Sequence, residues 1–181
     1  MFNPSIANIT LTNQIILWST LIIPWLTLFF MKKEDIRRYL PAALFVMLIS
    51  AIIIDAGVRL GFWVIKENVF PLNELLPYPF GLYPALTMWI LKFTNGNFLK
   101  YIVTNAILDL GFAYIWQGYL MSVVTGIVLF NVTGWQNWLI ALGRAILLYI
   151  FQKLWEGEPL RLSTLSLSPH PAAAKPDRDP K

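Results

Sequence analysis

The chain has 181 residues, of which 57% are hydrophobic and only 13% are charged, with a formal net charge of +4. A soluble domain has about twice that share of charged residues, so the composition argues against a soluble protein. The chain has no cysteine, which excludes disulfides, thiolate nucleophiles and cysteine-ligated metals. Its one histidine, His170, stands in a polar tail. We therefore expect neither a metal site nor a cofactor.

Two apolar blocks at the start of the chain predict two membrane helices. The first covers Leu11–Met31 and is kinked at Pro24; nothing before it resembles a cleavable signal, so we expect it to be retained. The second covers Tyr39–Val58, with Ile65 as an alternative end. Between them lies KKEDIRR, residues 32–38, with four basic and two acidic side chains. Because Lys and Arg stay on the cytoplasmic side of a membrane, this cluster indicates the orientation.

A proline-rich aromatic stretch, LLPYPFGLYPALTMWILK, leads into the third helix. Each proline fixes φ and removes a backbone donor, so residues 71–79 are poorly suited to a continuous helix. Pro84 suits the first turn of a helix, because its missing N–H is not needed there. We expect a short helix over Phe80–Thr94. Residues 71–81 are then either an outer surface loop or a shallow re-entrant one.

The second half of the chain predicts two more membrane helices. Asn95-Gly96-Asn97 is a strong turn signal, and apolar segments follow at Phe98–Gln117 and Trp135–Phe151. Residues 118–134 are apolar but broken by glycines. They form either a short extra segment, interfacial or half-inserted, or a continued crossing.

Five crossings place the N-terminus outside and the C-terminus in the cytoplasm. The basic residues follow this arrangement, because only Arg59 and Lys66 fall outside. The cytoplasmic side holds Lys32, Lys33, Arg37, Arg38, Lys92, Lys100, Lys153 and Arg161, with Lys175, Arg178 and Lys181 of the tail. If residues 118–134 cross fully, the C-terminus lies outside instead.

Two charged residues fall inside predicted membrane helices. Asp109 lies nine residues after Lys100, and Arg144 lies nine residues before Lys153. Each therefore sits roughly 13 Å from the same face of a core about 30 Å thick. Since unpaired charges there cost at least ~2.5–3.5 kcal/mol each, we expect Asp109 and Arg144 to pair. The pair is either a polar site or proton path, or a structural ion pair that sets the helix register.

Other polar residues suggest weaker sites. Asn105 and Gln117 add polar groups to the helix that carries Asp109, on a face expected to point into the bundle. Asp55 and Arg59 have i, i+4 spacing and predict an ion pair near the outer interface. Gly57 and Gly61 have the spacing of small residues at close helix contacts in membranes.

The order of features from Leu76 to Glu156 resembles an uncharacterised family of small multi-pass membrane proteins from spore-forming Bacillota. The stretches that carry the likeness are LPYPFGLYPALTMWILKF, FLKYIVTNAILDLGFAYIW, GIVLFNVTGWQNW and ALGRAILLYIFQKLWE. The resemblance implies a plasma-membrane bundle of four or five helices and no established activity. In that family an acidic residue, often followed by proline, stands where this chain has Gln117-Gly118. This departure puts any carboxylate role at that position in doubt.

We therefore predict an all-α, multi-pass transmembrane bundle over residues 1–160 and a disordered cytoplasmic tail over residues 161–181. No catalytic motif is present, so the leading hypothesis is a non-enzymatic accessory or interaction protein of the bacterial plasma membrane. The alternative is a small transporter or channel component that uses the Asp109/Arg144 polar site. The expected partners are the lipid bilayer and either a membrane protein or a second copy. Nucleic acid is not expected, because the basic residues flank membrane segments.

Overall fold

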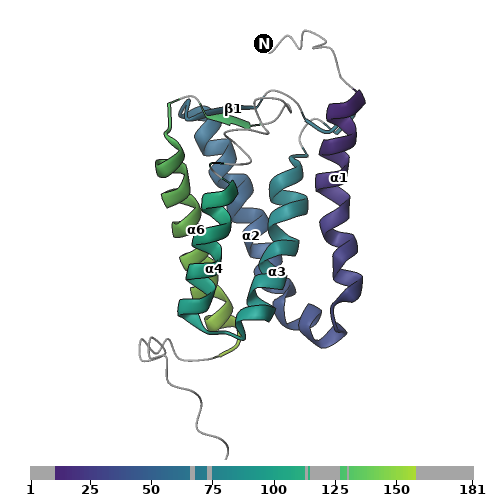
Figure 1. The fold of residues 1–181 in the computed structure, drawn as a ribbon, viewed down its shortest axis with the longest axis vertical. Helices are drawn as coiled ribbons and strands as arrows, with labels where there is room; N and C mark the ends of the chain where they lie inside the picture. Colours follow the sequence, from purple (N-terminus) through teal and green to yellow (C-terminus); the bar gives the residue numbers. More distant parts are fainter. Residues whose placement is uncertain are drawn as a thin grey trace, which may run out of the picture.

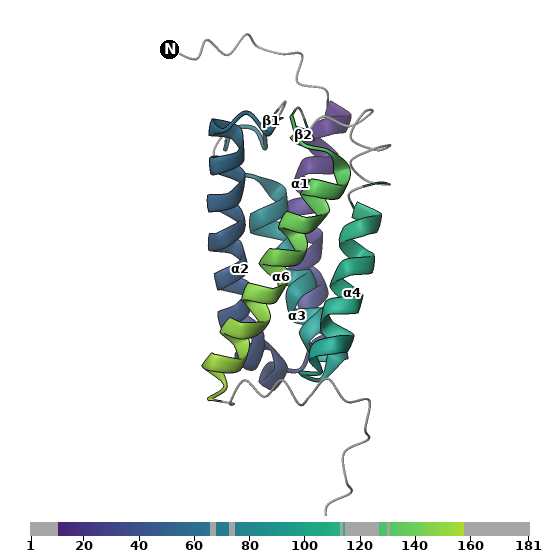
Figure 2. The same ribbon diagram turned by 90° about the vertical axis from the view of Figure 1, so that its left-hand side faces the viewer.

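A computed structural model describes residues 11–65, 68–72, 75–112, 114, 127–129 and 131–157. Within these residues the chain forms five α-helices and one short ribbon, which confirms the all-α prediction. The helices are α1 (Leu11–Thr27), α2 (Lys33–Arg59), α3 (Tyr83–Thr94), α4 (Phe98–Gly111) and α6 (Gly134–Trp155). They run side by side, with α1 at the edge of the bundle (Figures 1 and 2). The predicted tail over residues 161–181 lies outside the described residues.

The helix bounds differ from the predicted ones at several ends. A 3-10 turn, η1 (Leu28–Phe30), closes α1, and α2 begins at Lys33 rather than Tyr39. All of the basic cluster except Lys32, the N-cap, is therefore helical. Glu34 and Asp35 lie in the first turn, where their charges interact favourably with the positive end of the helix dipole. The α-helical part of α4 ends at Gly111, and Gln117 lies outside the described residues.

A two-stranded ribbon, which the sequence did not predict, lies across one end of the bundle (Figures 1 and 2). Strand β1 (Trp63–Ile65) pairs antiparallel with β2 (Ile127–Leu129), with Trp63 opposite Leu129. The second helix thus does not reach Ile65. The pairing also keeps residues 127–129 at the end of the bundle where α2 finishes, so α6 starts from that end.

The proline-rich stretch dips into the bundle. Its turn η2 (Tyr78–Leu82) has π-helical geometry and leads directly into α3, so the irregular stretch ends earlier than predicted. Trp25 donates its indole N–H to the carbonyl of Phe80 at 2.7 Å. A Cβ on Gly81 would lie 2.5 Å from the carbonyl oxygen of Thr20. Thr20 is nine residues into α1, or ~14 Å from its start, so this turn packs against the middle of that helix.

Gln14 of α1 holds the approach to this turn. Its side-chain amide donates to the carbonyl of Asn68 at 3.0 Å and accepts from the backbone N–H of Phe70 at 2.9 Å. The side chain of Gln14 therefore provides hydrogen-bond partners for two backbone groups of the loop. Polar groups that are buried need such partners.

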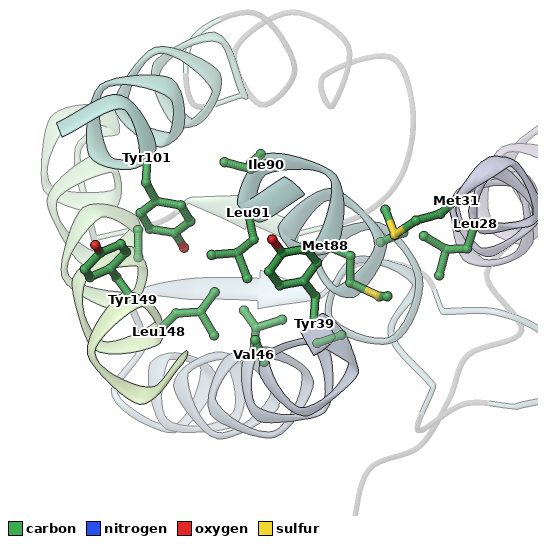
Figure 3. Packing of buried hydrophobic residues seen from close by; sticks show 14 residues of the cluster. Leu28, Met31, Tyr39, Val46, Met88, Ile90, Leu91, Tyr101, Leu148 and Tyr149 are labelled. Carbon is green, nitrogen blue, oxygen red and sulfur yellow. The ribbon is translucent and has the colours of Figure 1, made fainter. Parts of the chain in front are cut away.

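The main apolar core lies where α2, α3, α4 and α6 meet. Figure 3 shows Tyr101 of α4 pointing toward Leu91 of α3, with Leu148 of α6 and Val46 of α2 nearby. The rings of Tyr101 and Tyr149 are 5.4 Å apart, and the Tyr149 hydroxyl donates to the carbonyl of Gly96 at 2.7 Å. This last bond ties the α3–α4 turn to α6.

At the same end, Glu156 joins α2 to α6. Its carboxylate accepts from Arg38 at 2.5 Å and from Gln152 at 2.8 Å, and Lys153 lies 3.8 Å away. Burial alone would raise the pKa of Glu156, but the hydrogen bonds from Arg38 and Gln152, with the charges of Arg38 and Lys153, outweigh it. The pKa of Glu156 therefore lies below its ordinary value of 4.5.

This depressed pKa predicts a loss of stability in acid. Because Glu156 has a lower pKa in the folded state, its ionised form stabilises the fold above the unfolded-state value of 4.5. The contribution disappears as the pH falls through the lower folded-state pKa. Because Arg38 is half exposed, we expect the ionised Glu156 to contribute at most about 1 kcal/mol to the free energy of unfolding. Thermal unfolding in detergent should be measured from neutral to acid pH. The unfolding temperature of the wild type should approach that of Glu156→Gln once the pH lies below the folded-state pKa of Glu156. A gap between them that is the same at every pH would contradict this account.

The outer surface of the bundle is largely apolar. Among the residues that the structure describes, three helical segments are long and apolar enough to cross a membrane: Leu11–Phe30, Lys33–Arg59 and Gly134–Trp155. Large side chains that face outward include Ile23 at 55% exposure, Leu48 at 60% and Ile107 at 65%. Soluble proteins rarely expose so much apolar surface to water, so these helices are compatible with a membrane protein.

Candidate functional site

Asp109 of α4 and Arg144 of α6 lie together in the interior of the bundle. A guanidinium nitrogen of Arg144 is 3.6 Å from a carboxylate oxygen of Asp109, which is the distance of an ion pair rather than of a hydrogen bond. Their side chains are only 14% and 15% exposed. Arg144 is ten residues from the start of α6 and eleven from its end, so the pair lies at mid-height of that helix.

Two further helices hold Arg144 in place. Its other terminal nitrogen donates to the hydroxyl of Ser50 on α2 at 3.3 Å. Its guanidinium carbon lies 4.2 Å from the centre of the Tyr83 ring on α3, a close cation–π contact. Arg144 therefore connects all four helices that build the main core.

Asp109 is less completely satisfied than its partner. One carboxylate oxygen faces Arg144, and the other, Oδ2, is buried with no hydrogen-bond partner among the described residues. A buried acceptor without a donor costs folding free energy. A bound molecule that donates a hydrogen bond to this oxygen would remove that cost.

Two cavities meet at the ion pair. A small one of about 60 Å³ extends toward the ribbon, past Ser50 and Trp63. A larger one of about 350 Å³ lies between α3, α4 and α6 and is mostly apolar, with Asn105 on its wall. Asp109 and Arg144 line both cavities. The larger volume is within the range of small-molecule sites, which combine apolar walls with a few polar groups.

The remaining predicted site residues fall in different places. Asn105 shares the larger cavity with Asp109, and its amide donates to the carbonyl of Tyr101 in its own helix at 2.8 Å. Arg59 and Asp55 form an exposed ion pair at 2.8 Å, away from the cavities. Gln117 lies outside the described residues.

Sequence reasoning missed Ser50 and Tyr83. Ser50 is a lone hydroxyl in an apolar run, and this isolation could have marked it as facing inward. In the structure its side chain is 2% exposed. Tyr83 stood among several aromatic residues of the proline-rich stretch, so nothing in the sequence distinguished it. Only the packing of η2 and α3 brings its ring to Arg144.

At the centre of the site are a carboxylate and a guanidinium, and the largely apolar walls of the two cavities add the hydroxyls of Ser50 and Tyr83 and the amide of Asn105. Among the described residues, no three His, Asp or Glu side chains could together hold a metal ion. What the arrangement can do is bind a polar group that donates to Asp109 and accepts from Arg144. A hydroxyl or a primary amide has that combination.

Comparisons with protein-family models, with curated proteins and with solved structures give no match for this chain.

Proposed function

We propose that this chain is a multi-pass integral protein of the bacterial plasma membrane, with the N-terminus outside and the C-terminus in the cytoplasm. The three long apolar helices and their apolar outer faces support this proposal. The charges support the orientation, because Lys33, Arg38, Lys92 and Lys153 gather at one end of the bundle and Arg59 stands at the other.

The activity that we propose is the binding or passage of a small solute at the Asp109–Arg144 pair, as in a small transporter or channel component. The observation that carries it is the meeting of two cavities at this pair, next to the unpartnered Asp109 oxygen. A molecule with an apolar body and a hydroxyl or amide head would fit both the apolar walls and the two charges.

A second candidate is a non-enzymatic accessory protein that packs against a partner helix or a second copy. Gly143 favours it, because it is exposed and a Cβ there would meet nothing within 4 Å. Small residues at a helix surface allow close approach in membranes. Gly57, in contrast, is covered by the Trp63 ring, so the predicted small-residue face of α2 is used within the chain.

Single cysteines test both parts of the proposal, since the chain has none of its own. Glu34→Cys and Leu72→Cys probe the two ends of the bundle in sealed right-side-out vesicles. An impermeant thiol reagent should label Leu72→Cys at once and Glu34→Cys only after the vesicles are opened. Labelling of both positions without opening would contradict the proposed orientation.

For the solute site, Ala141→Cys lines the smaller cavity, and Leu139→Cys on the outer face of the same helix is the matched control. A small cationic thiosulfonate should modify Ala141→Cys several times faster, because a solute site must admit water. Equal protection of both positions would reject the solute site and leave the accessory candidate.

A further inference from the structure

A groove on the outer face of the bundle is separate from the Asp109–Arg144 site. It runs between α2 and α6 and has a volume of about 520 Å³. Its floor is aromatic, because Phe45 and Phe151 stack with ring centroids 4.1 Å apart and Trp155 continues the stack at 6.4 Å from Phe151. Leu44 and Leu48 form its α2 wall, and both are more than half exposed.

One end of the groove is cationic. Arg37 lines it and is exposed, and Lys33 stands four residues earlier, on the same face of α2. Of the four arginines in the described residues, Arg38, Arg59 and Arg144 form ion pairs, whereas Arg37 forms none. The neighbouring acids Asp35 and Glu156 are already neutralised by Lys92 and Arg38. Glu34 is the remaining acid of this turn, so the local balance is positive.

The length of the groove matches one leaflet of a bilayer. Arg37 and Leu48 are eleven residues apart on one helix, which is ~16 Å. Half of a hydrocarbon core about 30 Å thick is nearly the same distance. An acyl chain lying on the aromatic floor would thus begin at the cationic end and finish near the bilayer centre.

We propose that this groove binds an anionic phospholipid of the cytoplasmic leaflet. Its phosphate contacts Arg37 and Lys33, and one acyl chain lies over Phe45 and Phe151. Arginine suits this role because its planar fork matches phosphate oxygens. The proposal rests on the membrane part of the proposed function and is independent of the solute site.

Trp155 supplies a probe for this lipid. The protein is reconstituted into vesicles with phosphatidylglycerol or phosphatidylcholine brominated in the upper part of the acyl chains, and tryptophan quenching is measured. Subtracting the signal of Trp155→Phe isolates Trp155, while phenylalanine keeps the stack on Phe151. Brominated phosphatidylglycerol should quench the Trp155 signal at a lower mole fraction than brominated phosphatidylcholine. Arg37→Gln should reduce this preference about fivefold, and Arg59→Gln at the other end should leave it unchanged.

Each other outcome overturns the proposal in a distinct way. Equal quenching by the two lipids would mean that the groove takes any lipid. No quenching of Trp155 by either lipid would mean that a second copy of the protein covers the groove. If the protein does not enter vesicles at all, the membrane proposal fails with it, whereas normal insertion without a lipid preference rejects the lipid site alone.

Discussion

The Arg144→Met variant should lose about 3–5 kcal/mol of folding free energy, the usual effect of removing one partner of a buried ion pair. The reason is that Asp109 would stay behind at 15% exposure with neither of its oxygens paired. Tyr83 would lose its cation and Ser50 its hydrogen-bond donor at the same time. Methionine is about as long as the aliphatic stem of arginine and carries no charge, so the change keeps the stem and removes the guanidinium.

Thermal unfolding of the purified protein in mild detergent would measure the loss. Arg59→Met is the matched control, because the Arg59–Asp55 pair is exposed and should contribute less than about 1 kcal/mol. The charge-free double variant Asp109→Leu/Arg144→Met should recover most of the stability, since apolar replacements of buried ion pairs are often neutral or better. If Arg144→Met unfolds at the same temperature as Arg59→Met, the ion pair is not important for the fold.

The Gly81→Ala variant should lose about 3 kcal/mol, at the upper end of the range for overpacked sites. The new Cβ would lie 2.5 Å from the carbonyl oxygen of Thr20 and 2.6 Å from the Cα of Leu21. Both are backbone atoms of α1, so no side chain can rotate away. The turn and α1 must therefore separate, which weakens the bond from Trp25 to the Phe80 carbonyl.

Gly143→Ala provides the control for this second variant. A Cβ at Gly143 meets nothing within 4 Å, and alanine favours a helix by roughly 0.5–1 kcal/mol over glycine. The unfolding temperature should therefore fall below that of the wild type in Gly81→Ala and rise above it in Gly143→Ala. Protease cleavage between α1 and α2 should also increase only in Gly81→Ala. Equal stability of the two variants would mean that α1 does not pack on the turn as described.

The helices themselves could be predicted because hydropathy and turn chemistry are local properties. Asn95 has φ 48° and Gly96 has φ 70°, the left-handed geometry that an Asn-Gly turn favours, and α4 begins at once after it. The approach of Asp109 to Arg144 could also be expected. Two antiparallel helices joined in sequence order place residues that are equally far from one face at the same depth.

The misplaced ends have a common cause. Charged residues such as Lys33 to Arg38 are unfavourable inside a membrane, so hydropathy places the start of the second membrane segment after them. Charge does not prevent the same helix from extending out of the membrane, and α2 begins at Lys33. The ribbon was missed because Trp63–Ile65 and Ile127–Leu129 are far apart in the chain, and neither strand is long enough to show an alternating pattern.

The sequence by itself determined the all-α class, the apolar helices and the charges that they carry, because these follow from composition and from the spacing of residues along the chain. Only the tertiary structure decided what surrounds those charges. Ser50, Tyr83 and the two cavities reach Arg144 through contacts between helices that no local pattern encodes. The same holds for Gly81. Only glycine fits at this position, because the backbone of α1, sixty residues away in the chain, leaves no room for a Cβ atom.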